Sequence, residues 1–173
     1  GCPEGSTLED WPITYHDLEP FYEKAEQEIG VAGDADANPF QAPRRKPYPM
    51  PPFAYNTEGR LLEASARRLG FHPFPLPMLR NSVPRDGRAA CIHCRSCVGF
   101  ACEVQAKCGT QNTVIPAAIR TGNCRVFTGC VAKEVLTDAR GRATGVAYFD
   151  PRDRLQRQEA DLVVISASAT ESA

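Results

Sequence analysis

The chain has 173 residues, of which 42% are hydrophobic and 24% are charged, and these values are typical of a globular protein with a core. Its net charge of −1 gives no whole-chain attraction to nucleic acid or anionic lipid, so nucleic acid is not expected as a partner. No apolar run reaches the length of a membrane span, so no transmembrane segment is predicted.

The first predicted helix covers residues 14–30. Thr14 and Asp17 have the spacing of a capping box, and Gly30 can end a helix in the left-handed conformation. Pro20 suits the first turn of a helix, so a second helical stretch is expected to begin there. Apolar residues recur at helical spacing along this segment, namely Leu18, Phe21, Tyr22, Ala25 and Ile29.

Four glutamates of this helix are expected to form a solvated face: Glu19, Glu23, Glu26 and Glu28.

The next segment, residues 33–56, contains six prolines, which exclude a regular helix and a central strand. A loop of this length in a compact fold is usually functional or wraps a neighbouring domain. Its basic triplet, residues 44–46, is expected to be a solvated turn rather than a phosphate site.

A short amphipathic helix is predicted over residues 58–69, ended by Gly70. Residues 71–79 then alternate apolar residues with prolines. Because proline cannot donate a main-chain hydrogen bond, this alternation predicts an edge strand or an extended segment.

Cysteines crowd the loop at residues 88–109. Thiolates at such short spacings hold iron–sulfur clusters, although the fourth cysteine here follows after four residues instead of three. Structural zinc, with His93 as a ligand, is an alternative, and so is a set of reduced or bridged cysteines that only shapes a tight loop. The candidate metal ligands lie within twelve residues and are Cys91, Cys94, Cys97 and Cys102.

Beyond this loop, residues 113–120 predict a short helix with Pro116 in its first turn. The continuously apolar run at residues 162–165 indicates a strand with both faces covered. Segments rich in β-branched residues and separated by turns predict three strands, over residues 123–137, 144–149 and 157–167. The expected fold class is α+β, with N-terminal helices, a long proline-rich loop, the cysteine loop and a three-stranded antiparallel β-meander.

The sequence offers no complete catalytic site. None of His16, His72 and His93 has a sequence partner that indicates a general base, so no catalytic residue is predicted. No two glycines lie two positions apart, which excludes the Gly-x-Gly-x-x-Gly fingerprint of dinucleotide binding. The strand pattern at the end of the chain leads directly into a helix start, so we expect an internal piece of a longer polypeptide.

Several segments resemble bacterial glucose–methanol–choline (GMC) oxidoreductases, in the order in which that family has them. The first is Asp-Trp-Pro-Ile-Thr-Tyr-His-Asp-Leu-Glu-Pro-Phe-Tyr at residues 10–22, and residues 91–107 resemble a cysteine-rich loop found in a subset of the family. The last segment, residues 168–172, resembles the opening of the family's second signature. The segments between them are residues 113–118, 122–126, 141–146 and 160–169.

The resemblance implies an internal piece of a flavoenzyme that binds FAD, oxidises an alcohol or sugar substrate and passes electrons to an acceptor. It places the Rossmann segment and a histidine base outside this chain. Within the chain, Val131 is expected to contact the adenine side of FAD through its main chain. An iron–sulfur cluster on the cysteine loop would be a second redox group. The rival hypothesis is a non-catalytic zinc or iron–sulfur module.

The same resemblance implies three portions. Residues 1–87 would be a helical and proline-rich cap or linker, and residues 88–122 would be the cysteine loop with a short helix. Residues 123–173 would be the meander portion of the FAD-binding domain, leading into a Rossmann-type sheet outside this chain.

Overall fold

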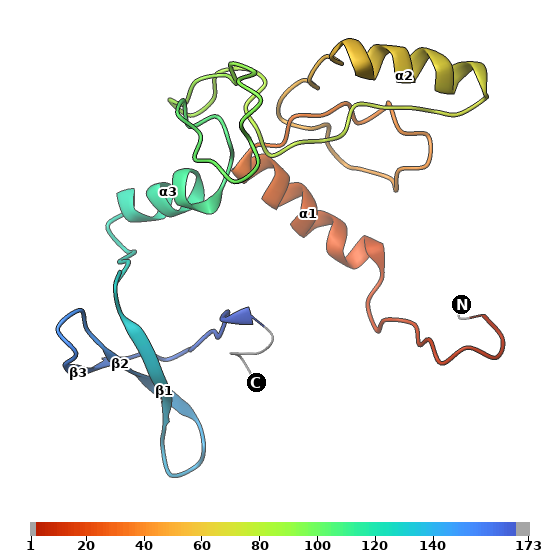
Figure 1. The fold of residues 1–173 in the computed structure, drawn as a ribbon. Coiled ribbons are helices and arrows are strands. Elements are labelled where there is room, and N and C mark those ends of the chain that lie inside the picture. The colour runs from red at the N-terminus through yellow and green to blue at the C-terminus, as the bar shows by residue number, and fades with distance from the viewer. Residues whose placement is uncertain (1–2, 169–173) are drawn as a thin grey trace. The chain divides into compact units, whose positions relative to one another are not determined.

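The computed structural model describes residues 3–168, in two compact units, residues 1–123 and 124–173, which are treated separately. No helix in this described range is both long and apolar enough to cross a membrane. The elements of the first unit are α1 (Tyr15–Ile29), α2 (Thr57–Arg68), a 3₁₀ turn (Thr110–Asn112) and α3 (Val114–Arg120). Those of the second unit are β1 (Val131–Thr137), β2 (Ala143–Phe149) and β3 (Leu155–Glu159) (Figure 1).

Helix α1 begins and ends where the sequence predicts. The Thr14 side chain accepts the Asp17 N–H, the Asp17 carboxylate accepts the Thr14 N–H at 2.8 Å, and Gly30 closes the helix at φ 92°. The prediction of a second stretch beginning at Pro20 is wrong, because one helix runs through it. The capping box starts the helix upstream, and a proline near the N-terminal end removes only one main-chain hydrogen bond.

The prediction of a solvated acidic face on α1 is wrong for Glu19, Glu23 and Glu26, whereas the Glu28 side chain is 55% exposed, as predicted. Glu19 is 7% exposed, and the side chains of Glu23 and Glu26 are 11% and 23% exposed. The basic triplet of the following loop contacts them. The Arg44 side chain is 14% exposed, contrary to the predicted solvated turn, whereas the side chains of Arg45 and Lys46 are 65% and 61% exposed, in agreement with it. Phe21 and Tyr22 are exposed instead. We call this set the clasp: Glu19, Glu23 and Glu26 with Arg44, Arg45 and Lys46.

The contacts of the clasp join side chains to side chains and to main chain. Arg44 forms an ion pair with Glu26, and Lys46 Nζ lies 2.8 Å from Glu23 Oε1. The Arg45 N–H donates to Glu19 Oε1 at 3.0 Å. The proline-rich loop is therefore bound along α1 by charge, since its prolines cannot supply regular secondary structure.

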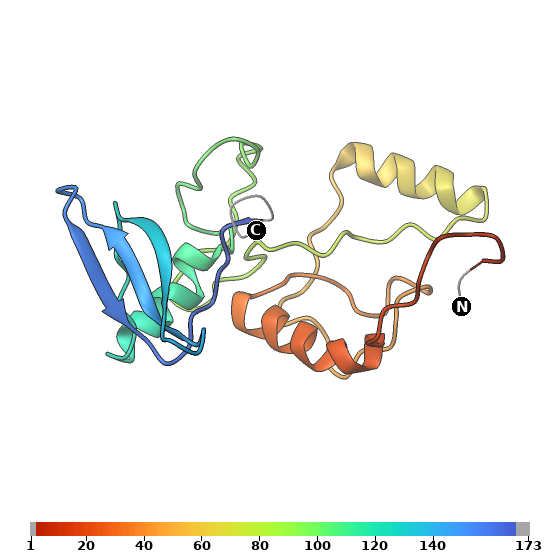
Figure 2. The ribbon, with the colours of Figure 1, turned by 90° about the horizontal axis from the view of Figure 1, so that it is seen from below.

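The core of the first unit is small and lies where distant segments meet. Ala32, Met50 and Cys108 are buried together, and Ile29 and Phe53 pack against them. Main-chain hydrogen bonds join Ala32 and Met78 in both directions, at 2.9 and 2.8 Å. The extended segment that was predicted over residues 71–79 thus helps to close this core and runs beside α2 in both views (Figures 1 and 2).

Two further helices agree with their predictions. Asn56 caps α2 by accepting the Gly59 N–H at 2.8 Å, and Gly70 follows the helix at φ 81°. No residue of α2 is buried, and Leu61 and Leu62 are 67% and 71% exposed. Helix α3 lies within the predicted residues 113–120.

The second unit is the predicted three-stranded antiparallel meander, in the order β1-β2-β3 (Figure 2). Val131 pairs with Phe149, and Phe149 pairs in turn with Leu155. Two predicted boundaries are wrong. The first strand begins at Val131 instead of 123, and the third covers Leu155–Glu159 instead of residues 157–167.

The apolar run at residues 162–165 is exposed, contrary to the prediction that both of its faces are covered. Leu162, Val164 and Ile165 are 78%, 74% and 55% exposed. The ladder between β2 and β3 stops before this run, because its last pair joins Glu159 to Gly145 near the beginning of β2. Within residues 3–168, no further strand lies beside the run, so its β-branched residues alone do not make it a strand.

The turn between β2 and β3 gives the first testable prediction. Hydrogen bonds from Arg154, at 2.7 and 2.9 Å, lower the pKa of Asp150 from 3.8 to about 2. Because the folded pKa is depressed, the contribution of Asp150 to stability is present above pH 3.8 and is lost as the pH falls toward about 2. A carboxyl-carbon NMR titration should give a midpoint of about 2 for Asp150. The midpoint should rise in Arg154→Met, and an unchanged midpoint would contradict the assignment.

Candidate functional site

The cysteine loop is attached to the core through Asn81, which has no exposed surface. The Asn81 N–H donates to the Ala106 carbonyl at 2.8 Å, and the Cys91 N–H donates to the Asn81 carbonyl at 2.9 Å. Its side-chain amide donates to the Ala89 carbonyl at 3.2 Å. A single buried residue therefore holds the entry and the exit of the loop.

A buried cation lies at the base of the loop. Arg88 is 9% exposed, and its Nη1 donates to the Gln105 carbonyl at 3.2 Å and to Cys108 Sγ at 3.5 Å. The Cys108 thiol donates to Asn81 Oδ1 at 3.1 Å. No carboxylate of the described residues pairs with Arg88, so neutral dipoles alone compensate its charge.

Lys107 ties the middle of the loop to its end. Its ammonium donates to the carbonyls of Cys97 and Phe100, at 2.6 and 2.8 Å. Asn112 Nδ2 donates to the Lys107 carbonyl at 2.7 Å. The shape of the loop is thus fixed by hydrogen bonds from the side chains of Lys107 and Asn112 to its main-chain carbonyls.

The four predicted ligands do not form a metal site in this arrangement. Cys94 is exposed, whereas Cys91, Cys97 and Cys102 are partly buried. Among residues 3–168, no group of three or more His, Cys, Asp or Glu side chains lies close enough to hold a metal ion. The cysteine ligand set remains a prediction.

Backbone strain is concentrated in the same loop. His93 and Arg95 have φ angles of 55° and 64°, in the left-handed region that side chains with a Cβ rarely adopt. Each such residue costs on the order of 1 kcal/mol or more, and strain of this kind is kept where the surrounding structure enforces it.

Cys102 is the thiol whose chemistry the loop alters most clearly. The main-chain N–H groups of Lys107 and Ala106 point at its sulfur, the latter at 3.2 Å, and they lower the pKa of the Cys102 thiol. The Lys107 charge acts in the same direction. The reactive thiolate therefore forms at lower pH than in an ordinary cysteine.

This lowered pKa can be tested by alkylation. The pH midpoint for iodoacetamide labelling of Cys102, followed by site-resolved mass spectrometry, should lie lower in the folded chain than in the same chain unfolded in urea. The comparison uses one residue in two states, so the intrinsic nucleophilicity of the thiol is matched. Equal midpoints would show that the main-chain N–H groups do not act on this sulfur.

Val131, the predicted FAD-contacting residue, is the first residue of β1 and is 65% exposed. Strand β1 lies at one edge of the three described strands, so part of its main chain has no strand partner. The position can accept a main-chain contact from a ligand. Whether FAD makes that contact remains a prediction.

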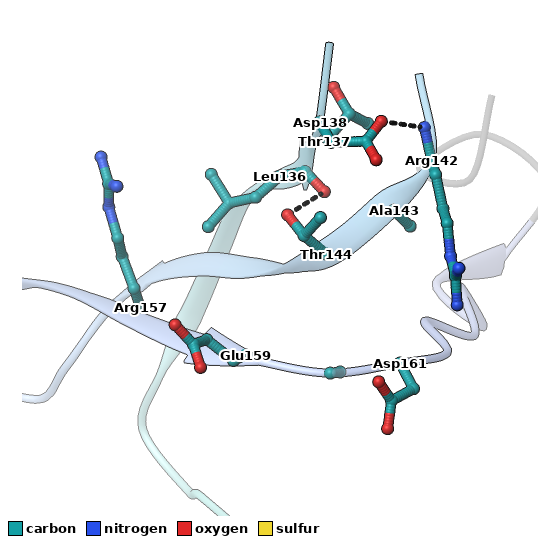
Figure 3. Close-up of a pocket in the computed structure, with 10 residues that line it drawn as sticks. Leu136, Thr137, Asp138, Arg142, Ala143, Thr144, Arg157, Glu159 and Asp161 are labelled. Atoms are coloured by element: carbon teal, nitrogen blue, oxygen red, sulfur yellow. Dashed lines mark hydrogen bonds between the residues drawn. The ribbon is translucent and has the colours of Figure 1, made fainter. Parts of the chain in front are cut away.

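The meander also has a hollow of about 790 Å³ at the turn between β1 and β2 (Figure 3). Asp138 Oδ1 accepts the N–H groups of Arg140 and Arg142 at 2.8 and 3.0 Å, and Thr144 Oγ1 donates to the Leu136 carbonyl at 3.2 Å. These groups hold the turn. We assign no ligand to the hollow, because its best-placed carboxylate already accepts two main-chain hydrogen bonds.

Sequence patterns do not identify Asn81 and Arg88. Both act by bonding to carbonyls that lie elsewhere in the chain, and no local spacing marks such a residue. The cysteine crowding located the loop, but not the residues that shape it.

Comparison with known proteins gives a consistent result. The profile of the GMC oxidoreductase family matches residues 57–173. The chain is 31% identical to the gluconate 2-dehydrogenase flavoprotein of Pantoea cypripedii, over 95% of the chain and 30% of that protein. It is 32% identical to the fructose dehydrogenase large subunit of Gluconobacter japonicus, over 94% of the chain and 30% of that protein.

A third relative is the 6'''-hydroxyparomomycin C oxidase of Streptomyces lividus, which is 31% identical over 94% of the chain and 30% of that protein. The chain thus spans 30% of the length of each of these three relatives. The matched region of the chain includes the cysteine loop, the meander and Val131.

Proposed function

Because the chain belongs to the GMC oxidoreductase family, we propose that it is an internal portion of an FAD-dependent enzyme that oxidises a CH–OH group of an alcohol or sugar. The observation that carries the proposal is the match along nearly the whole chain to relatives named for gluconate and fructose. The exposed apolar side chains support an internal portion, since Trp11 and Val98 are 82% and 90% exposed.

FAD, when bound, supplies the redox chemistry by accepting the two electrons that leave the CH–OH carbon. The contribution of this chain is narrower. The exposed start of β1 would bind the adenine side of the cofactor through the main chain of Val131, whatever the side chain there. The base that takes the hydroxyl proton and the Rossmann sheet would belong to other parts of the enzyme, and the electron acceptor would be a separate partner.

An iron–sulfur cluster on Cys91, Cys94, Cys97 and Cys102 is a separate proposal. The short spacing and the strained backbone at His93 and Arg95 support it. The four thiols in their present arrangement do not fit a metal, so we derive no electron-transfer step from them. Iron with equimolar sulfide in the intact protein would support a cluster, and metal-free protein would leave the cysteines as loop architecture.

The function is tested on the polypeptide that contains this chain in its natural reading frame. We expect about one FAD for each chain, and we expect gluconate-like or fructose-like substrates to bleach the flavin absorption without oxygen. Bound flavin that no alcohol or sugar reduces would contradict the proposed substrate class. Bound zinc or iron without flavin would favour the rival hypothesis of a non-catalytic metal module.

A further inference from the structure

A cleft of about 560 Å³ lies beside the cysteine loop in the first unit and is not used by the proposed flavin chemistry. Its walls include the aromatic rings of Phe53, Tyr55 and Phe74. Three basic side chains, those of Arg80, His93 and Arg95, also line the cleft. None of its described lining residues carries a carboxylate. The cleft therefore combines apolar faces with an excess of positive charge.

Arg80 is the best-placed cation in this cleft. Its guanidinium carbon lies 3.9 Å from the centre of the Phe53 ring, and its Nη1 lies 3.7 Å from Cys97 Sγ. No described carboxylate forms an ion pair with it, and its buried Nε has no hydrogen-bond partner in the described structure. These contacts fix the orientation of the Arg80 side chain, but its Nε still lacks a hydrogen-bond acceptor.

A second unmet hydrogen bond belongs to Tyr55, which lines the same cleft. Its hydroxyl is buried and has no partner among the described residues. Burial, reinforced by the charge of Glu63 and opposed by that of Arg67, raises the pKa of Tyr55, so the phenol keeps its proton and can donate a hydrogen bond. A ligand with an oxygen anion could satisfy donors of this kind.

The other two basic side chains of the cleft, those of His93 and Arg95, come from the cysteine loop, where both residues have a strained backbone. His93 and Arg95 are the two left-handed residues described above, and the His93 ring packs edge-on against Phe53 at 5.5 Å between centroids. The loop conformation therefore brings two cationic or protonatable groups to the cleft that Phe53 and Arg80 already border.

We propose that this cleft binds a flat aromatic or quinonoid ring that carries an anionic group such as a carboxylate or a sulfonate. Phe53 already carries the Arg80 guanidinium, so Tyr55 and Phe74 offer the stacking surfaces to the ring. Arg80 and Arg95 offer charge-assisted hydrogen bonds to the anion. The volume is in the range of small-molecule sites. Binding requires only residues of the first unit, so it is independent of flavin and of turnover.

The test is isothermal titration, with anthraquinone-2-sulfonate, of the polypeptide that contains this chain in its natural reading frame. We expect one site. Arg80→Gln should raise the dissociation constant roughly ten- to a hundredfold, the usual effect of losing a charge-assisted hydrogen bond. Arg60→Gln is the matched control, because Arg60 is exposed on α2 and does not line the cleft; it should leave binding unchanged. An uncharged analogue, 2-(hydroxymethyl)anthraquinone, should bind more weakly by a similar factor.

Arg95→Gln serves as a second variant, because the Arg95 side chain is exposed and its replacement opens no cavity in the core. Circular dichroism checks the helix content of each variant. It too should weaken the sulfonate relative to the uncharged analogue. Equal binding of the sulfonate to the wild-type chain and to both folded variants would overturn the proposal. Failure of the wild-type chain to bind at millimolar concentration would overturn it as well, and neither result would bear on the flavin proposal.

Discussion

Replacing Asn81 by alanine should lower the free energy of unfolding of the first unit by about 2 to 4 kcal/mol. The substitution removes the amide that donates to the carbonyls of Arg88 and Ala89, and it removes the acceptor of the Cys108 thiol. Asn81, Cys108 and Arg88 are buried, so water cannot replace the bonds among them without a local opening. Urea unfolding followed by circular dichroism measures the change.

Asn123→Ala is the matched control for this prediction. Asn123 is exposed and its side chain has no described hydrogen bond, so the change should stay within about 0.5 kcal/mol. If Asn81 anchors the loop, the Asn81→Ala chain should also show faster labelling of Cys91 and Cys108 by a thiol reagent below its unfolding transition. Equal stability of the two variants would show that Asn81 does not anchor the loop.

The second large effect is expected at the clasp. Glu26→Gln should cost about 2 kcal/mol, a value between those for exposed and for fully buried ion pairs. Arg44 is 14% exposed, and its guanidinium stacks on Tyr48 at 4.0 Å, so it cannot simply turn into water when its partner is lost. The hydrogen bond with Glu26 raises the pKa of Arg44. An arginine stays charged even without such a partner, so the variant leaves a largely buried charge without its carboxylate.

The clasp also has a pH dependence with a definite sign. The hydrogen bond from Lys46 lowers the pKa of Glu23 below 4.5. The contribution of Glu23 to stability is therefore present above pH 4.5 and is lost as the pH falls through the lowered folded value.

Lys24→Met is the control for the clasp variants, because the Lys24–Glu28 pair is exposed and long, at 3.9 Å, and should contribute little. If Glu26→Gln costs no more than Lys24→Met, the clasp does not stabilise the loop.

Local signals explain which parts of the fold the sequence predicts. The capping box at Thr14 and the glycine at position 30 are short-range features, and both ends of α1 lie where they indicate. The meander follows from alternating segments and polar turns between adjacent strands. The clasp was missed because Arg45 and Glu19 meet across 26 positions, and sequence spacing carries no information about such a contact. The apolar run at residues 162–165 has strand composition, but pairing requires a neighbour.

The site was predictable only as a location. Cysteine spacing marks the loop, yet the same spacing is compatible with a cluster, with zinc or with bare thiols, because spacing along the chain does not fix where each sulfur points. The positive φ values at His93 and Arg95 were invisible to sequence patterns, since neither residue is a glycine or an asparagine. Arg80 was missed for a related reason, because its role depends on Phe53 and Cys97.

The clasp should also determine how readily a protease cuts the proline-rich loop. Trypsin cuts after arginine and lysine but not before proline. The bonds after Arg44 and Arg45 are therefore targets in this proline-rich loop, whereas the bond between Lys46 and Pro47 is not. Their ion pairs hold the segment along α1, so cleavage has to wait for a local opening whose population is set by the strength of those pairs. Arg140 and Arg142, exposed on the turn after β1, carry no such restraint on their side chains. At low salt trypsin should therefore cut the meander turn faster than the proline-rich loop, and concentrated salt should reduce this difference in rate.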